Sequence, residues 1–243
     1  MNRNDLRAIL GTGLLFGLLA TAGWAQTLTP MQRRALAQTN TELNLSAGEL
    51  HSLGLLAPED RMQQACPLGG TAKGARIKAA NVLKNRDAIP TPANFDPAFT
   101  LAAVLAPGND TARWNQSRAG VLVGYAHNAK PGGIETVNCG AKAIPDRDTH
   151  IELVLSLPDS AGKRRVIVEV TPRMRKWAKA QGFDWSTPTL EKTLIGHKVE
   201  IRGWVFDDFE HAPNAENTHP RNKLNWRATT WELHPITSIR IIQ

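Results

Sequence analysis

The chain has 243 residues, with 29 basic and 22 acidic side chains and 6 % aromatic residues. That length allows one medium-sized domain with an additional segment, or two small domains. The net charge of +7 is modest and the charges are interspersed, so the composition permits contact with an anion without requiring it. Beyond residue 25, no stretch is long and apolar enough for a membrane-spanning helix.

Residues 1–25 have the order of a secretory signal peptide. Arg3 and Arg7 precede an apolar run, and small residues follow up to Ala25. The run is shorter than the roughly 20 residues that a spanning helix needs. We therefore expect cleavage before Gln26 and a periplasmic or extracellular mature protein, without a membrane span.

Cys66 and Cys139 are the two cysteines of the chain. In an oxidising compartment two cysteines most simply form one disulfide bond, which here would join the N-terminal part to the C-terminal part. A metal site or a catalytic thiol would need more partners than the neighbouring sequence offers.

Residues 26–118 are expected to form an irregular region of short helices and loops. Thr29 before Pro30 is a typical helix start, and Ser46 with Glu49 forms a capping box. Turn-forming residues separate the later segments. Two more helices are predicted in this region, at residues 72–86 and 98–105.

Residues 119–243 change to the period of two that is typical of strands. Helical segments follow the third predicted strand, at 173–182 and from Thr187 onward. The five predicted strands are 120–127, 149–157, 164–173, 197–206 and 228–242. Three strands, a helix and two strands is the order of the oligonucleotide/oligosaccharide-binding (OB) barrel. We therefore predict a mainly β fold, α+β overall, with a five-stranded OB-like barrel. The alternatives are another small β-barrel or an α+β sheet.

Two long loops connect strands of this predicted barrel, at residues 128–148 and 207–227. They correspond to the loops with which OB barrels hold their ligands. Long loops in compact domains are usually functional or disordered. The second loop is crowded with polar side chains: Asp207, Asp208, Glu210, His211, Asn214, Glu216, Asn217 and His219.

Distinctive motifs occur along most of the mature chain. The longer ones are DTHIEL (148–153), VEVTPR (168–173), EHAPNAENT (210–218), NWRAT (225–229) and WELHP (231–235). The shorter ones include LKNR (83–86), APGND (106–110) and GGIET (132–136). With these motifs the chain resembles a family of secreted bacterial proteins that has no assigned reaction. The resemblance implies secretion and one compact unit, but no mechanism.

Alternation along the strands predicts which side chains face the core. The expected inward residues are Ile151, Leu153, Leu155, Leu157, Val166, Val168, Val170, Trp231 and Leu233. The expected outward residues include His150, Glu152, Glu169, Glu232 and His234. Pro235 has no backbone donor, so we expect the ladder to be interrupted or bulged there.

This polar outer face has a structural and a functional interpretation. It can be the solvated side of an antiparallel sheet. It can also belong to a secreted binding module for an oligosaccharide, a nucleic acid or another anion. The expected ligand contacts are then Glu210, His211, Asn217, Arg227, Glu232 and His234. A basic cluster at 164–179 beside Trp177 fits either a nucleic-acid track or an exposed helix face.

A metal-dependent hydrolase, for instance a phosphodiesterase, is the alternative. Imidazole and carboxylate groups are suitable ligands for a divalent metal ion. The candidate catalytic residues are His150, Glu152, Glu169, His211 and His234. However, the chain has no HExxH, PCxxC or GxSxG motif, so the sequence leaves open whether the protein is an enzyme. A structural envelope protein whose loops bind another protein is a third interpretation.

Overall fold

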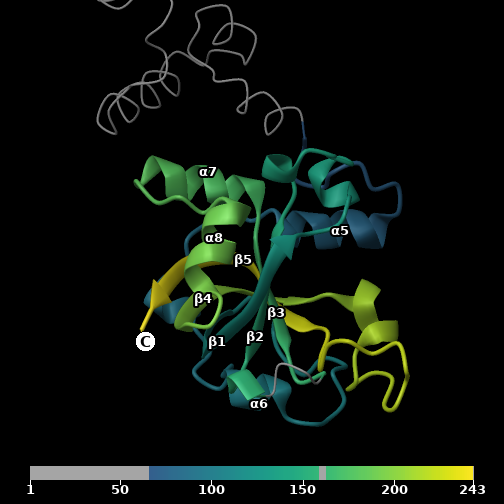
Figure 1. Ribbon diagram of the computed structural model, residues 1–243. Coiled ribbons are helices and arrows are strands. Elements are labelled where there is room, and N and C mark those ends of the chain that lie inside the picture. Colours follow the sequence, from purple (N-terminus) through teal and green to yellow (C-terminus); the bar gives the residue numbers. More distant parts are fainter. Residues whose placement is uncertain (1–65, 159–162, 243) are drawn as a thin grey trace, which may run out of the picture. The chain divides into compact units, whose positions relative to one another are not determined.

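The structure, a computed structural model, describes residues 66–158 and 163–242. The predicted signal peptide and the helix starts at Thr29 and Ser46 lie outside these residues. Five strands form a closed barrel with the order β1-β2-β3-β5-β4 (Figure 1). Their bounds are β1 Ala119–Pro131, β2 Thr149–Val154, β3 Val166–Val170, β4 Lys198–Asp207 and β5 Trp231–Ile241.

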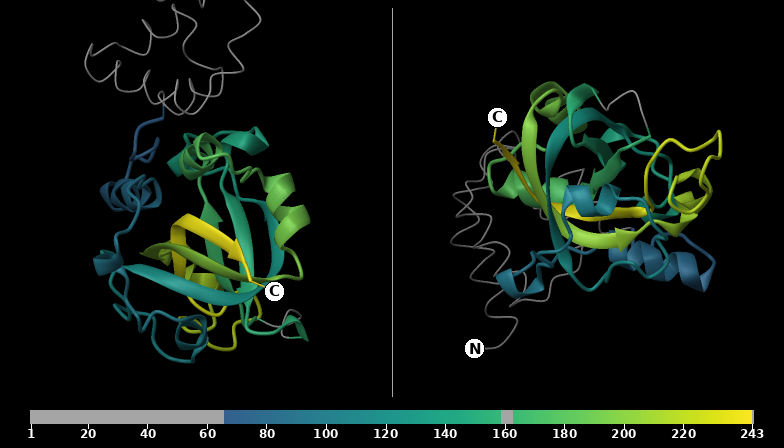
Figure 2. Two further views of the ribbon diagram at one scale, coloured as in Figure 1. Left: turned by 90° about the vertical axis from the view of Figure 1, so that its left-hand side faces the viewer. Right: turned by 90° about the horizontal axis from the view of Figure 1, so that it is seen from below.

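The barrel closes through the antiparallel pairing of β1 with β4, and Figure 2 shows the strands curving around the core. The β3–β5 pair is parallel, whereas the other strand pairs of the barrel are antiparallel. A long crossover between β3 and β4 makes this arrangement possible, because neighbouring parallel strands cannot be joined by a tight turn. The predicted fold class, a mainly β chain with an OB-like barrel, is confirmed.

Short helices surround the barrel. The α-helices are α5 Ala75–Lys84, α6 Leu101–Leu105, α7 Pro172–Ala180 and α8 Thr187–Leu194. The 3₁₀ helices are η2 Pro92–Asn94, η3 Thr136–Asn138, η4 Ile144–Asp146 and η6 Phe209–Asn214. Both α7 and α8 have proline in the first turn, where its missing N–H costs no hydrogen bond. In Figure 1, α6 lies at the end of the barrel opposite α7.

The hydrophobic core fills the barrel with side chains from alternate strand positions. The predicted inward residues of β2, β3 and β5 are buried in it, and helices α6, α7 and α8 add apolar side chains. Leu155 and Leu157, however, are 38 % and 39 % exposed, so their prediction as core residues was wrong. The reason is that β2 ends at Val154 and the alternation ends with it.

The β4–β5 ladder is irregular around Pro235, as the sequence predicted. The register shifts on both sides of Gly203, and the His234–Pro235 peptide bond is cis. A Cβ atom on Gly203 would lie 2.5 Å from the carbonyl oxygen of Pro235. Glycine therefore permits a close backbone approach that a larger residue would prevent.

A second layer covers the outer face of β5. Helix α5 packs on β5 and on η3, with Asn81, Lys84 and Asn85 buried at the contact. Asn85 Nδ2 donates to the carbonyl oxygens of Leu68 and Val137. The Arg86 guanidinium donates to three distant carbonyl groups, those of Gln116, Val205 and His234. The LKNR motif thus holds this layer on the barrel mainly through polar contacts.

A disulfide bond joins Cys66 to Cys139, with 5.8 Å between the Cα atoms, which confirms the predicted pairing. It fixes the start of the second layer to the residue that follows η3. Such a bond is compatible with a location outside the cytoplasm. Within the described ranges, no helix has the length and apolar character needed to cross a bilayer.

Removing this bond should lower stability substantially, because it closes a loop between residues 73 positions apart. We expect the double substitution Cys66→Ser and Cys139→Ser to lower the free energy of unfolding by about 2–5 kcal/mol. Denaturant unfolding of the oxidised proteins measures this difference, and reduced wild type should match the variant. Coincident unfolding curves for the variant and the oxidised wild type would contradict the prediction.

Candidate functional site

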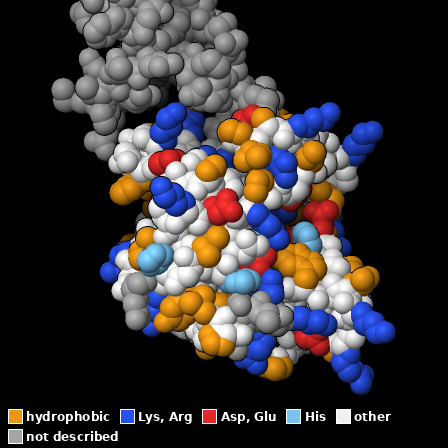
Figure 3. All heavy atoms as spheres, in the orientation of Figure 1, with side chains coloured by type: hydrophobic (Ala, Val, Ile, Leu, Met, Phe, Trp, Pro, Cys, Tyr) orange, Lys and Arg blue, Asp and Glu red, His pale blue; other side chains and the backbone are white. Residues whose placement is uncertain are grey.

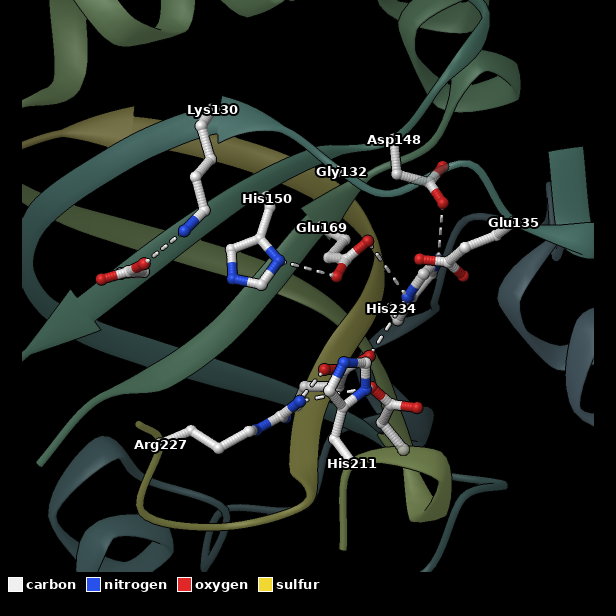
Figure 4. A network of polar contacts seen from close by, with 12 residues as sticks. Lys130, Gly132, Glu135, Asp148, His150, Glu169, His211, Arg227 and His234 are labelled. Atoms are coloured by element: carbon white, nitrogen blue, oxygen red, sulfur yellow. Dashed lines mark hydrogen bonds and ion pairs between the residues drawn. The ribbon is translucent and has the colours of Figure 1, made fainter. Parts of the chain in front are cut away.

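Four polar side chains form a row across the outer face of the barrel, here called the outer row: Lys130, His150, Glu169 and His234 (Figure 4). Lys130 is the cross-strand partner of His150, and His150 is the partner of Glu169. His150 Nδ1 lies 3.3 Å from Glu169 Oε1, and Glu169 Oε2 lies 3.8 Å from His234 Nδ1. The predicted convergence of polar side chains from β2, β3 and β5 is therefore confirmed.

This face is not the solvated side of a sheet. The exposed fraction of the side chain falls from 51 % at Lys130 to 12 % at His150, 9 % at Glu169 and zero at His234. Helix α5 and the η3 segment cover its inner end, where Lys84 Nζ lies 3.2 Å from Glu135 Oε2. The interpretation as a solvated face is wrong because the alternation of one strand does not show that a second layer covers it.

Arg227 connects the β4–β5 loop to this face. Its guanidinium is fully buried and lies 3.2 Å from Asp208 Oδ2 and 2.9 Å from Glu232 Oε2. Glu232 Oε1 in turn lies 3.2 Å from His234 Nδ1. Ion pairs and hydrogen bonds thus link loop residues to the inner end of the outer row. We call the whole set the charged network: Lys84, Glu135, Asp148, His150, Glu169, Asp208, His211, Arg227, Glu232 and His234.

Three members of the charged network form its innermost cluster. Asp148, Glu169 and His234 are all buried, and each offers one ligand atom within 4.8 Å of the other two. Asp148 ends the β1–β2 loop directly before β2, whereas the other two lie on β3 and β5. These residue types and distances could hold a metal ion.

The pKa values of the three side chains in this cluster are shifted in different directions. Burial alone would raise the pKa of Glu169, but the His150 hydrogen bond and the charge of His234 hold it at about 2. Burial raises the pKa of Asp148 to about 7 despite the opposing charge of His234. Burial also disfavours imidazolium at His234, yet Glu169, Glu232 and Asp148 raise its pKa above the ordinary value. The cluster therefore favours a positive charge at its centre.

Trp226 lies at the outer edge of the charged network. Its ring centroid lies 5.6 Å from that of His150 and 5.7 Å from that of His211. His211 Nδ1 is 2.6 Å from Asp208 Oδ2, so the β4–β5 loop is tied to the network there. Trp226 and His211 remain partly exposed. Figure 3 shows acidic, basic and histidine side chains close to hydrophobic side chains on this face of the molecule.

The structure does not bring all of the predicted catalytic and ligand-binding residues into this site. Glu152 shares the outer face but is held by Lys130 at 3.2 Å and Arg165 at 2.6 Å. Glu210 is exposed, outside the charged network. Asn217 bonds Asp110 and lines a different groove, between residues 107–111 and 216–220.

Two arginines of the basic cluster at 164–179 make structural contacts. The Arg175 guanidinium donates to the carbonyl oxygens of Pro145, Arg147 and Trp185, which fixes it as a structural contact. Arg173 donates to the carbonyl oxygen of Cys66. These two cations therefore hold loops on the fold, whereas Arg164, Lys176 and Lys179 are exposed.

Sequence reasoning missed several network members, namely Lys84, Glu135, Asp148 and Asp208. Three of them stand inside motifs that had been noticed for other reasons: LKNR, GGIET and DTHIEL. Asp148 and Asp208 lie directly next to strands, Glu135 lies in the β1–β2 loop, and Lys84 ends helix α5. A period of two predicts no face at any of these positions. Their place within those motifs is the signal that could have identified them.

Comparison with known proteins gives no match to a family model, to a curated protein or to a solved structure. The class of protein therefore rests on the strand order, and the site rests on its geometry.

Arg227 should be essential for the stability of this face. We expect Arg227→Met to lower the free energy of unfolding by about 3–5 kcal/mol, because the buried Glu232 and Asp208 both lose the guanidinium that pairs with them. Arg240→Met is the matched control, since that guanidinium pairs with Glu200 while 63 % exposed. The control should cost less than about 1 kcal/mol. Similar losses for both variants in denaturant unfolding would contradict the assigned role of Arg227.

Proposed function

We propose that this protein is a secreted OB-like binding module, whose ligand lies between the β1–β2 and β4–β5 loops. The observation that carries the proposal is the outer row, which leads from exposed Lys130 to buried His234 between these two loops. OB barrels typically use the same loops and the same face of β2 and β3 for their ligands.

The chemistry of the entrance favours an anionic ligand with a ring that can stack. Lys130 is half-exposed beside His150, and Lys163, 41 % exposed, lies near Glu216 of the β4–β5 loop. Trp226 offers a partly exposed aromatic surface next to His150. An acidic oligosaccharide and a single-stranded nucleic acid share these features, and aromatic rings stack on either.

Secretion is supported by the order of residues 1–25 and by the disulfide bond. The mature protein should begin at Gln26. N-terminal sequencing of the native protein tests this, and a chain that still begins at Met1 would contradict secretion.

Ligand binding should depend on Trp226. Calorimetric titration with three probes, an acidic oligosaccharide, a neutral oligosaccharide and single-stranded DNA, should show binding of an anionic probe. Trp226→Leu should weaken that binding by about 1–3 kcal/mol, roughly 5- to 150-fold, the usual effect of losing one stacking ring. Trp177→Leu, which changes a tryptophan packed on Trp185, is the control. The proposal is contradicted if none of the three probes binds with a Kd below about 1 mM.

A metal-dependent hydrolase is the second candidate, and the cluster of Asp148, Glu169 and His234 favours it. His150 lies between this cluster and the entrance, in a position to take a proton from an attacking water. Release of nitrophenol from bis(p-nitrophenyl) phosphate with added zinc tests this role. Wild-type activity in His150→Gln would contradict it.

A further inference from the structure

Two buried atoms of the innermost cluster lack a hydrogen-bond partner within the described residues: Asp148 Oδ1 and His234 Nε2. Their side chains are 1 % and 0 % exposed. An unsatisfied buried polar group destabilises the folded state, so most such groups in proteins have a partner. The two atoms belong to side chains that face each other, with 3.9 Å between His234 Nε2 and Asp148 Oδ2. A shared partner of both groups would remove this cost.

Each of the three side chains in the cluster is oriented by a neighbour. Asn138 Nδ2 donates to Asp148 Oδ2 at 2.9 Å, and His150 Nδ1 lies 3.3 Å from Glu169 Oε1. These contacts leave Asp148 Oδ1 without a partner among the described residues, while Glu169 Oε2 faces His234 at 3.8 Å from Nδ1. Ligands of protein-bound metals are commonly fixed by contacts of this kind.

The orientation of His234 follows from its contact with Glu232. Glu232 Oε1 lies 3.2 Å from His234 Nδ1, so the Nδ1–H of a neutral ring is donated to that carboxylate. The lone pair then lies on Nε2, the atom without a partner. A carboxylate behind a histidine that presents its other nitrogen is the usual arrangement at a metal site.

Charge within the network also favours a cation. Five carboxylates, from Glu135, Asp148, Glu169, Asp208 and Glu232, share the charged network with two permanent cations, Lys84 and Arg227, and with three histidines. Carboxylates buried in this way need positive charge beside them, from protonated histidines or from a bound cation. A divalent cation bound by Asp148 and Glu169 would neutralise both of these carboxylates.

We propose that Asp148, Glu169 and His234 bind one divalent transition-metal ion, with zinc as the best fit to two carboxylates and an imidazole. Ligand atoms up to 4.8 Å apart need to close by about 1–1.5 Å to reach the spacing around zinc, given zinc–ligand distances of about 2.0–2.2 Å. Three protein ligands leave a coordination position for water or a ligand group. The inference stands independently of the proposed ligand-binding role.

Calorimetric titration of the full, oxidised, metal-stripped protein with zinc chloride tests the site. We expect one zinc ion per chain with a Kd of about 1 μM or tighter. Asn138→Ala removes only an orienting contact and should weaken zinc binding by about 10- to 100-fold. Asp148→Asn and His234→Gln each remove a ligand and should weaken zinc binding more than this. Asp87→Asn and His197→Gln, which change exposed residues, are the matched controls and should bind like wild type.

A thermal unfolding scan keeps the test decisive if a variant is destabilised. Zinc should raise the Tm of wild type and of both controls, and should not raise that of folded Asp148→Asn. Absence of stoichiometric zinc binding to wild type, or undiminished affinity in folded Asp148→Asn and His234→Gln, would overturn the proposal. Either result would leave the Trp226-dependent ligand binding untouched, so the two roles fail separately.

Discussion

The buried guanidinium of Arg227 is the interaction on which the site depends. It lies between Asp208 and Glu232, and so joins the β4–β5 loop to strand β5. Without that cation, the buried Glu232 would lose its guanidinium partner, and Asp208 would be left with Lys84 and His211. Because Glu232 also contacts His234, the position of Arg227 determines how the innermost histidine is presented.

The second layer gives the barrel a buried polar face instead of a wet one. Helix α5 brings Lys84 to Glu135, and the disulfide bond fixes the segment that precedes this helix. Burial and neighbouring charges then raise the pKa of Asp148 to about 7 and keep that of Glu169 at about 2. On an uncovered sheet these side chains would have ordinary pKa values. Under the second layer their pKa values are shifted, and the cluster is suited to holding a cation near the entrance of the site.

Period-two patterns predicted the strands of the barrel and the faces of their residues, but not the end of β2 before Leu155 and Leu157. Trp231 and Leu233 lie in the core and Glu232 and His234 lie outside it, as the alternation requires. The irregularity at Pro235 was also predictable, because proline cannot donate to the ladder.

The burial of that outer face was not predictable from any single segment. It depends on contacts such as Arg86 with the carbonyl oxygen of His234, which are 148 positions apart. Asp148 and Asp208 escaped prediction because they flank strands, where side-chain direction follows from loop geometry and not from a repeat. Asn217 and Glu210 were chosen for their polarity in a long loop, and the structure separates them from the charged network.

We infer that the second layer and the barrel together enclose a cation site on the outer face of β3 and β5. Anomalous diffraction from crystals grown with zinc, recorded at the zinc absorption edge, tests it most directly. We expect a peak bounded by Asp148, Glu169 and His234, with distances of about 2.0–2.2 Å to their ligand atoms. Zinc peaks confined to surface histidines, with His234 bonded only to its neighbouring carboxylates, would contradict it.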